Sequence, residues 1–322
     1  MRPLRRLRSL LLFAVLTVGC AGVGEEAEVL DLRRSFPAPA GDSIVFRPPA
    51  YEIPAGTEKQ WCWATTYDGP DVGIIESHNY QVPGGHHVVL FGTSETERNL
   101  PDGEVWDCTE TDSLNMASFE PVIIGGSIEI DEEGVSNDFI LPEGIAAYLG
   151  SGQRLVLQSH YVNVTGSTIL VQDEAQFRTV PEDSVETWAA PWVNTTDNFA
   201  VPPHSEDYTV EFDCTWDGDY ELLQFGGHLH EWGRAISTSM TTADTGDTEV
   251  IYDVPDWAPV MRDAPPYHEF LPGEFIVKSG DSFHTTCTWF NNQDEELIFP
   301  REMCVVFGMA YPSKIPIICA AD

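Results

Sequence analysis

Proline and glycine interrupt this 322-residue chain at short intervals along almost its whole length. The chain contains 23 prolines and 26 glycines, and hardly any segment between them repeats its apolar residues with the period of about 3.6 that marks a helix. Short runs rich in aliphatic, β-branched and aromatic residues lie between the turns, which predicts an all-β protein of sandwich type. The expected strands cover residues 43–46, 59–65, 72–78, 86–91, 154–162, 168–171, 208–214, 220–232, 235–239, 249–252, 274–278, 283–290 and 303–309.

The first 19 residues have the features of an export signal. Four arginines precede the apolar stretch Leu10–Leu16, which is too short to span a membrane. The following residues, ending at Cys20, resemble a bacterial lipoprotein cleavage site, although Thr17 stands where leucine is usual. We therefore expect lipidation of Cys20, with ordinary signal-peptidase cleavage nearby as the alternative.

The residue after the cysteine bears on where the protein would be anchored. Ala21 is not the aspartate that retains a lipoprotein at the inner membrane, so we expect an outer-membrane or cell-surface lipoprotein, with a periplasmic or extracellular protein as the alternative. The lipid anchor would be its contact with the membrane. Residues 20–42 are acidic and then rich in proline and alanine, which is typical of a tether.

The cysteine count agrees with an exported protein. Lipidation of one of the seven cysteines leaves an even number for an oxidising compartment, which predicts three disulfides. The chain has no Cys-x-x-Cys spacing, which would have indicated zinc binding or thiol redox chemistry. The remaining cysteines are Cys62, Cys108, Cys214, Cys287, Cys304 and Cys319.

Length and charge narrow the class of protein further. After the signal, about 303 residues remain, which predicts two domains, and we place them at residues 43–182 and 183–322. Without the four signal arginines the formal charge falls from −36 to −40, so nucleic acid is not an expected partner. A solvated acidic surface explains this charge, with a cation-attracting site as the alternative.

The segment Gly226–His230 contains a His-x-His motif within an expected strand. Residues two apart in a strand share a face and lie about 6.5 to 7 Å apart, so two imidazoles can converge on one ion with bonds of about 2 Å. The two glycines before His228 allow a bulge or a close approach to the backbone. The alternative is a surface or half-buried histidine pair without a metal.

Three further features offer metal-ligand chemistry. His86 and His87 would point to opposite faces of a regular strand, so they can serve one ion only at a strand start or bulge, which Gly84–Gly85 would allow. His160 lies in an apolar strand, where a buried structural histidine is the alternative. Met303 normally indicates packing, but a thioether is a soft donor that selects copper, especially copper(I).

These segments, in this order, resemble the copper type II, ascorbate-dependent monooxygenases, the family of peptidylglycine- and dopamine-hydroxylating enzymes. The resemblance covers residues 43–322, and an ordered set of motifs is more specific than any one of them. The matching motifs are Tyr51–Thr57 with Trp61–Trp63, the His-His-x-x-Leu segment His86–Leu90, Leu141–Ile145, Leu157–Asn163, Gly227–His230, Gly280–Trp289 and Glu302–Cys304.

The resemblance implies two tandem jelly-roll β-sandwiches, each with one copper site, facing one another across a cleft. It assigns three histidines to an electron-supplying copper, and two histidines and a methionine to an oxygen-binding copper. Gln158 would lie near the first copper, with a core-facing amide as the alternative. The two ligand sets are His86, His87 and His160, and His228, His230 and Met303. The implied disulfides are Cys62–Cys108, Cys214–Cys319 and Cys287–Cys304.

The implied reaction is hydroxylation of an aliphatic carbon of a small molecule, using O2 and ascorbate or another one-electron reductant. The peptide-amidating branch holds a substrate carboxylate with an arginine, an asparagine and a tyrosine, where this chain has Gly226, Val305 and Phe307. An apolar or aromatic substrate is therefore expected, with Met309 at the pocket wall. His78, His204, His268 and His284 match no ligand position and are expected to be surface or structural residues.

Two other functions compete with a monooxygenase. A non-catalytic copper-binding protein would use the same scaffold, but a metal store does not need two sites with different donors. A protein that acts on glycans would need a pair of carboxylates as acid and base, and a chain with 52 acidic residues does not exclude one.

Overall fold

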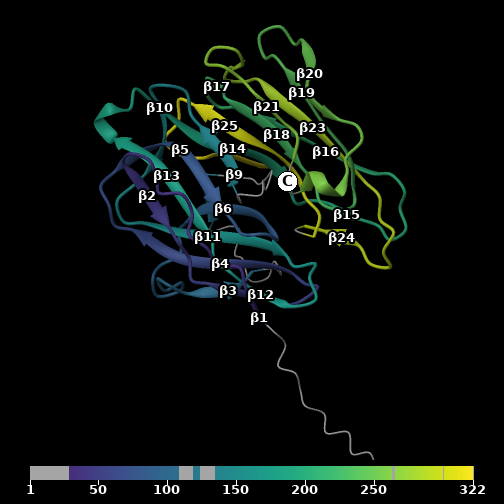
Figure 1. Ribbon diagram of the computed structural model, residues 1–322. Helices are drawn as coiled ribbons and strands as arrows, with labels where there is room; N and C mark the ends of the chain where they lie inside the picture. Colours follow the sequence, from purple (N-terminus) through teal and green to yellow (C-terminus); the bar gives the residue numbers. More distant parts are fainter. Residues whose placement is uncertain (1–28, 109–118, 124–134, 263–264, 300, 322) are drawn as a thin grey trace, which may run out of the picture.

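The computed structural model describes residues 29–108, 119–123, 135–262, 265–299 and 301–321 (Figure 1). Their regular elements are strands, apart from two short 3₁₀ helices, η3 (Glu182–Ser184) and η4 (Pro259–Arg262), so the all-β prediction is confirmed for this part of the chain. No helix in these residues could cross a membrane. Cys20 and the export signal lie outside the described residues.

Two sheets packed face to face form the first half of the chain. A five-stranded sheet of order β7-β4-β11-β6-β8 covers a second layer made of β2, β13, β5, β9 and β10. Apolar residues of both layers, such as Ile74, Leu90, Leu157 and Phe177, meet in one buried cluster between them. The bounds are β2 Ser43–Phe46, β4 Glu58–Tyr67, β5 Val72–Tyr80, β6 Gly85–Thr93, β7 Val105–Asp107, β8 Phe119–Ile123, β9 Val135–Ile140, β10 Ile145–Leu149, β11 Gln153–Val162 and β13 Glu174–Pro181.

A second pair of packed layers forms the second half. A four-stranded sheet of order β16-β23-β19-β20 faces β14, β25, β17, β18, β21, β22 and β26. Trp192 lies at the centre of their core, with its ring centroid 4.9 Å from that of Phe225 and 5.5 Å from that of Trp216. The bounds are β14 Thr187–Thr196, β16 Tyr208–Thr215, β17 Tyr220–Leu222, β18 Gln224–His228, β19 Gly233–Thr241, β20 Thr248–Val254, β21 Tyr267–Glu269, β22 Ile276–Val277, β23 Ser282–Trp289, β25 Cys304–Tyr311 and β26 Ile317–Ala321.

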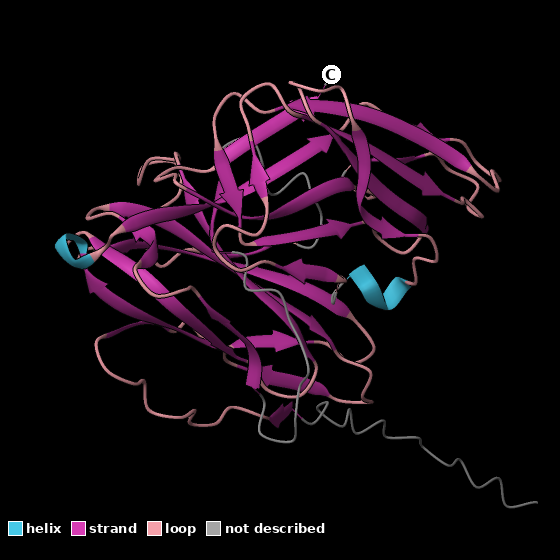
Figure 2. Ribbon diagram, turned by 90° about the horizontal axis from the view of Figure 1, so that it is seen from above, coloured by secondary structure: helices cyan, strands magenta, loops and turns pink. Residues whose placement is uncertain are grey.

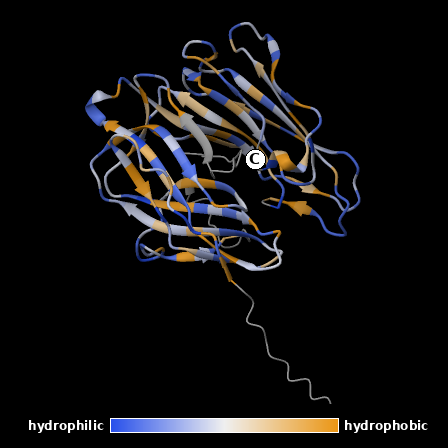
Figure 3. Cartoon of the chain, in the orientation of Figure 1, coloured by the Kyte–Doolittle hydropathy of each residue, from blue (hydrophilic) through white to orange (hydrophobic). Residues whose placement is uncertain are grey.

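Two small sheets complete the fold. One contains β1, β12 and β3 and packs its own apolar cluster around Tyr161, and the other pairs β15 with β24. Figure 3 shows hydrophobic and hydrophilic residues interleaved along the strands, as expected where one face of a sheet is buried and the other is solvated. The bounds are β1 Val29–Asp31, β3 Tyr51–Ile53, β12 Thr168–Val171, β15 Ala200–Val201 and β24 Leu297–Ile298.

One continuous sheet joins the two halves. Strand β10 pairs in parallel with the beginning of β14, from Ile145 opposite Thr187, and the rest of β14 pairs antiparallel with β25. The resulting 12-stranded sheet contributes one layer to each half, as the two lobes of Figure 2 illustrate. Packed sheets are therefore present in both halves, while the jelly-roll arrangement of their strands remains a prediction.

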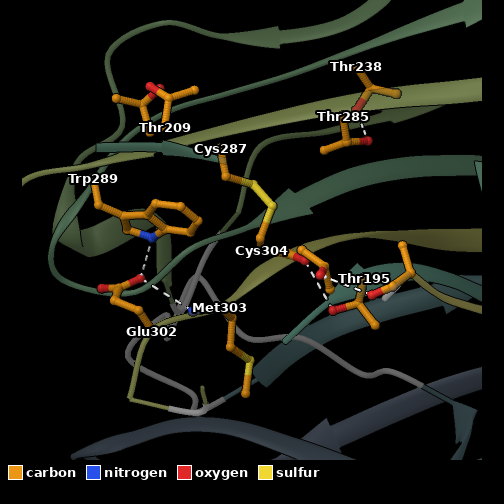
Figure 4. The surroundings of a disulfide bond; sticks show 12 residues. Thr195, Thr209, Thr238, Thr285, Cys287, Trp289, Glu302, Met303 and Cys304 are labelled. Atoms are coloured by element: carbon orange, nitrogen blue, oxygen red, sulfur yellow. Dashed lines mark hydrogen bonds between the residues drawn. A yellow bond between two sulfur atoms is a disulfide. The ribbon is translucent and has the colours of Figure 1, made fainter. Parts of the chain in front are cut away.

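All three disulfides implied by the family resemblance are present. Cys62–Cys108 fastens β4 to the residue after β7, and Cys214–Cys319 joins β16 to β26. Cys287–Cys304 connects β23 to the first residue of β25 across the second core (Figure 4). Three disulfides fit an oxidising extracellular environment.

A buried carboxylate accepts hydrogen bonds from a residue in strand β11 and from a residue beside it. Asp173, between β12 and β13, is completely buried and accepts hydrogen bonds from the Tyr161 hydroxyl and, at 3.3 Å, from Nε2 of Gln81. The same Gln81 nitrogen lies 3.4 Å from the carbonyl oxygen of His160. Burial raises the pKa of Asp173 from 3.8 to about 6, although these donors act in the opposite direction.

We predict that Asp173→Asn changes the pH dependence of stability. A carboxyl with a raised pKa binds more protons in the folded than in the unfolded state, so its contribution to the unfolding free energy falls as pH rises from about 4 to about 6. Over this pH range, the unfolding free energy of the wild type should fall by about 3 kcal/mol relative to that of the variant, since one pKa unit corresponds to about 1.4 kcal/mol. Urea unfolding of the metal-free proteins at several pH values measures the difference, and a constant difference would contradict the prediction.

Candidate functional site

A β-bulge brings the first three histidines together. His160 in β11 lies opposite His87 in β6, but the next residue, Tyr161, lies opposite Gly85, so His86 is the extra residue in β6. The ring centroid of His160 is 5.1 Å from that of His86 and 4.7 Å from that of His87. The bulge expected from Gly84–Gly85 is present, and it lets two adjacent histidines approach the same partner.

Glycine is required on the approach to this bulge. Gly84 has a φ of +94°, in the left-handed region that side chains rarely adopt. A Cβ on Gly85 would lie 2.5 Å from Cβ of Gln81, which is too close for a carbon contact. The turn that presents His86 and His87 therefore depends on both glycines.

The nitrogen atoms of the first group are arranged as ligands of one ion would be. Nδ1 of His160 is 3.4 Å from Nδ1 of His87, near the spacing of about 3.3 Å for two ligands with bonds of about 2 Å at a tetrahedral centre. Nε2 of His160 lies 2.8 Å from Oε1 of Glu58. A proton on Nε2 satisfies this carboxylate and leaves the Nδ1 lone pair directed toward His87, which is the usual arrangement behind a metal-bound histidine.

The second group lies where β18 and β25 begin to separate. His228 is the last residue of β18 and is opposite Val305 in β25. Met303 is two residues before Val305, so alternation along the chain places it on the same face as His228. The ring centroid of His230 is 4.9 Å from that of His228, and Nδ1 of His230 lies 3.0 Å from the carbonyl oxygen of Arg301. With Nδ1 of His230 on this carbonyl oxygen, Nε2 is the nitrogen through which His230 would bind a metal.

The prediction of one strand over residues 220–232 was wrong. The chain forms β17 and β18 with a break at Leu223, and His230 lies beyond the end of β18. The side chain of Trp257 donates to the carbonyl oxygen of His230 at 3.1 Å, and the backbone nitrogen of His230 donates to Glu302. These side-chain bonds replace the strand ladder at His230.

Glu302 organises the second group. Its completely buried carboxylate accepts hydrogen bonds from the backbone nitrogens of His230 at 3.0 Å and Trp232 at 2.8 Å, and from the Trp289 indole at 2.8 Å. Burial raises the pKa of Glu302 to about 7, against the effect of these donors. The carboxylate of Glu302 thus connects the turn at His230 to the chain segment that carries Met303. Sequence reasoning assigned no role to Glu302, although an acid between an apolar strand and a cysteine was a usable signal.

The disulfide fixes the direction of the Met303 side chain. Cys304 points into the second core to bond with Cys287, and Figure 4 shows Met303 extending on the opposite side of the chain. The backbone nitrogen of Met303 also lies 3.4 Å from the Glu302 carboxylate. The thioether is therefore held outside the core, on the face of β25 that carries Val305.

The glycines before His228 permit close packing. A Cβ on Gly227 would lie 2.7 Å from Cε1 of Tyr252 in the core. Gly226 is opposite Phe307, and a Cβ there would lie 3.3 Å from Cζ of that ring. The Phe307 ring therefore lies over Gly226 beside the His228 position.

Gln158 and Met309, two other residues singled out in the sequence, are both buried. Gln158 is on the His160 face of β11, but its Nε2 lies 4.0 Å from Sγ of Cys108, as expected for a core-facing amide. Its role near a metal remains a prediction. Met309 is buried in the core cluster of the first half, so the prediction that it forms a pocket wall was wrong. Strand β25 carries this side chain past the second core into the first.

The remaining histidines have contacts of their own. His78 lies 2.6 Å from Glu76, His204 is 3.1 Å from Asp294, and His284 is 3.0 Å from Asp213. His268 contacts the rings of Tyr252 and Phe270. These contacts are those of surface and structural residues.

Donor chemistry and partial geometry for a metal are both present. Within the described residues, no three His, Cys, Asp or Glu side chains already have the arrangement that holds an ion. The first group nevertheless has two nitrogens at ligand spacing, and the predicted second group combines two imidazoles with a thioether. Histidine with methionine suits copper better than zinc, calcium or magnesium, so the donor set fits copper.

Comparison with known proteins points to one family for the second half. Residues 192–321 match the model of the C-terminal domain of copper type II ascorbate-dependent monooxygenases. No curated protein matches the chain.

Solved structures give only weak similarities. A protein from a study of the triple jelly-roll fold and turret assembly of an archaeal virus is 9% identical, with a TM-score of 0.23 and coverage of 85% of this chain and 61% of its own length. A structure of infectious bursal disease virus strain Gx is 8% identical, with a TM-score of 0.21 and coverage of 85% and 74%. Similarity at this level says nothing about the activity of this chain. The matched residues 192–321 contain His228, His230 and Met303, and this match supports the copper type II ascorbate-dependent monooxygenase family for the protein.

Proposed function

We propose that the protein is a copper-dependent monooxygenase that hydroxylates an aliphatic carbon of a small apolar or aromatic molecule. The observation that carries the proposal is the pair of separate histidine groups, each with one ring nitrogen held by an oxygen acceptor. In the second group, Met303 precedes by two residues Val305, the residue opposite His228, which supports a thioether as its third donor. The match of residues 192–321 to the monooxygenase family supports the same function.

Each group would hold one copper ion, giving two per chain. His86, His87 and His160 would form the electron-supplying site, and His228, His230 and Met303 the oxygen-binding site. Bound copper would supply one-electron transfer and activation of O2, with ascorbate or another one-electron reductant as the electron source. Two sites with different donors suit this division of work, because the soft thioether favours the cuprous state at the site that must meet O2.

The chain's own residues would prepare both sites for this chemistry. Glu58 holds the proton of His160 on Nε2, and the Arg301 carbonyl holds that of His230 on Nδ1. Glu302 fixes the backbone on both sides of the second site, so the thioether and the His230 imidazole cannot separate freely. Export and lipidation at Cys20 would place this machinery at the outer membrane or cell surface.

We predict that Met303→Ile separates the two sites. The variant should fold and keep copper at the first group, but should lose the second copper(I) and at least about 100-fold in turnover, because the soft ligand is gone. Copper content under anaerobic reduction and O2 uptake with ascorbate measure these effects.

Met240→Ile is the matched control, since this buried core methionine in β19 lies away from the donors and a swap of similar volume is well tolerated. Undiminished turnover in Met303→Ile would contradict the assigned oxygen site. A wild type that binds two coppers without consuming O2 would instead indicate a copper-binding protein.

The substrate class can be tested at Phe307. An aromatic substrate that packs on this ring gains about 0.5 to 1.5 kcal/mol, so Phe307→Ala should lower kcat/KM for phenyl-bearing substrates by a factor of about 2 to 13. Copper content should not change. Wild-type turnover of a glycine-extended peptide that exceeds turnover of phenyl-bearing compounds would contradict the proposed substrate class.

A further inference from the structure

Arg262 lies between the two halves of the molecule. It is the last residue of η4, which both Figure 1 and Figure 2 show at the boundary between the two lobes. Its side chain is only 16% exposed, whereas that of Arg234 on β19 is half exposed. A guanidinium with so little solvent around it needs acceptors in the protein.

The two ends of this guanidinium contact carboxylates from different halves. Nη2 lies 3.0 Å from Oε1 of Glu58, the first residue of β4, and Nη1 makes a close ion pair with Oε1 of Glu231. Arginine suits this task because its planar fork offers several donors in fixed directions, whereas a lysine ammonium is a single point charge. Arg262 therefore bridges the first and second halves.

Each carboxylate in this bridge is directly connected to a proposed copper ligand, one by a hydrogen bond and the other by the chain. The Glu58 oxygen that meets Arg262 is the same Oε1 that lies 2.8 Å from Nε2 of His160. Glu231 directly follows His230 in the chain. A continuous path of one hydrogen bond, two ion pairs and one peptide bond thus runs from the first histidine group to the second.

We propose that Arg262 is a positioning residue that clamps the two copper sites to one another through Glu58 and Glu231. The proposal rests on the proposed function. The clamp fixes the separation over which an electron must pass, and it shares the Glu58 oxygen that orients His160. Without the guanidinium, the carboxylates of Glu58 and Glu231 would lose the cation that they share, in a chain whose formal charge is −36.

The bridge acts on position more than on stability. Glu58 and Glu231 are 42% and 38% exposed, and exposed ion pairs contribute only about 0 to 1 kcal/mol. The 12-stranded sheet already joins the halves through β10 and β14, far along the chain from Arg262. Loss of the bridge should leave the fold intact and should widen the range of distances between the sites.

Copper-loaded Arg262→Gln tests the clamp directly. Pulsed electron paramagnetic resonance should show a distribution of copper-to-copper distances at least about twice as wide as in the wild type, with two coppers still bound. In steady-state assays kcat should fall about 10- to 100-fold, the usual effect of losing an outer-shell partner, while KM stays within a factor of about two. Arg262→Lys should lie between the two proteins, and the control Arg234→Gln should match the wild type.

A measurement on the metal-free protein separates this proposal from the proposed function. Amide hydrogen exchange around Glu58 and Glu231 should quicken in Arg262→Gln and in Glu58→Gln, and the double variant should show less than the sum of the two effects. Additive effects, or an unchanged distance distribution, would overturn the clamp. A wild type without turnover whose exchange still shows the coupling would overturn the monooxygenase and leave the clamp standing.

Discussion

The position of the second candidate copper site relative to the first half depends on the backbone pairing of β14. This strand joins β10 at one end and β25 along the rest of its length, so a single sheet runs through both halves. Alternation along β25 then divides its side chains between two environments. Cys304 and Val306 enter the second core, whereas Met309 on the opposite face is buried in the first core. Met303 and Phe307 share the face of Met309, which directs them toward the first half.

The two histidine groups reach their geometry by different physical means. In the first, a backbone irregularity between β6 and β11 gathers the rings, and Glu58 orients one of them from the side. In the second, the strand ladder ends at His228, and the buried carboxylate of Glu302 holds the following turn. Burying a carboxylate is unfavourable unless its oxygens receive hydrogen bonds, and the donors around Glu302 supply them. These hydrogen bonds therefore form a local framework that strand pairing alone would not provide.

Local patterns in the sequence predicted much of this, and non-local contacts account for what they missed. Short runs of aliphatic, β-branched and aromatic residues between turns indicated the strands, and Gly84–Gly85 indicated the bulge, because both depend on neighbouring residues. The break at Leu223 and the turn at His230 were not predicted, since they depend on Trp257 and Glu302, which lie far away in the chain. Arg262 likewise looks like any charged residue until the fold places Glu58 beside it. The ligand residues themselves were found through an ordered set of motifs and remain to be tested as ligands.

The case against an anionic substrate has a local and a global part. Locally, the Phe307 ring lies over Gly226, so a long cationic side chain at that position would have to displace the ring. Globally, a formal charge of −36 gives the molecule a negative field, which lowers the concentration of anions near its surface within a Debye length of about 8 to 10 Å. A carboxylate-bearing substrate would need a cation at the site to overcome this field. Arg262 does not supply one, because its guanidinium already contacts Glu58 and Glu231. A neutral or cationic apolar molecule meets neither obstacle.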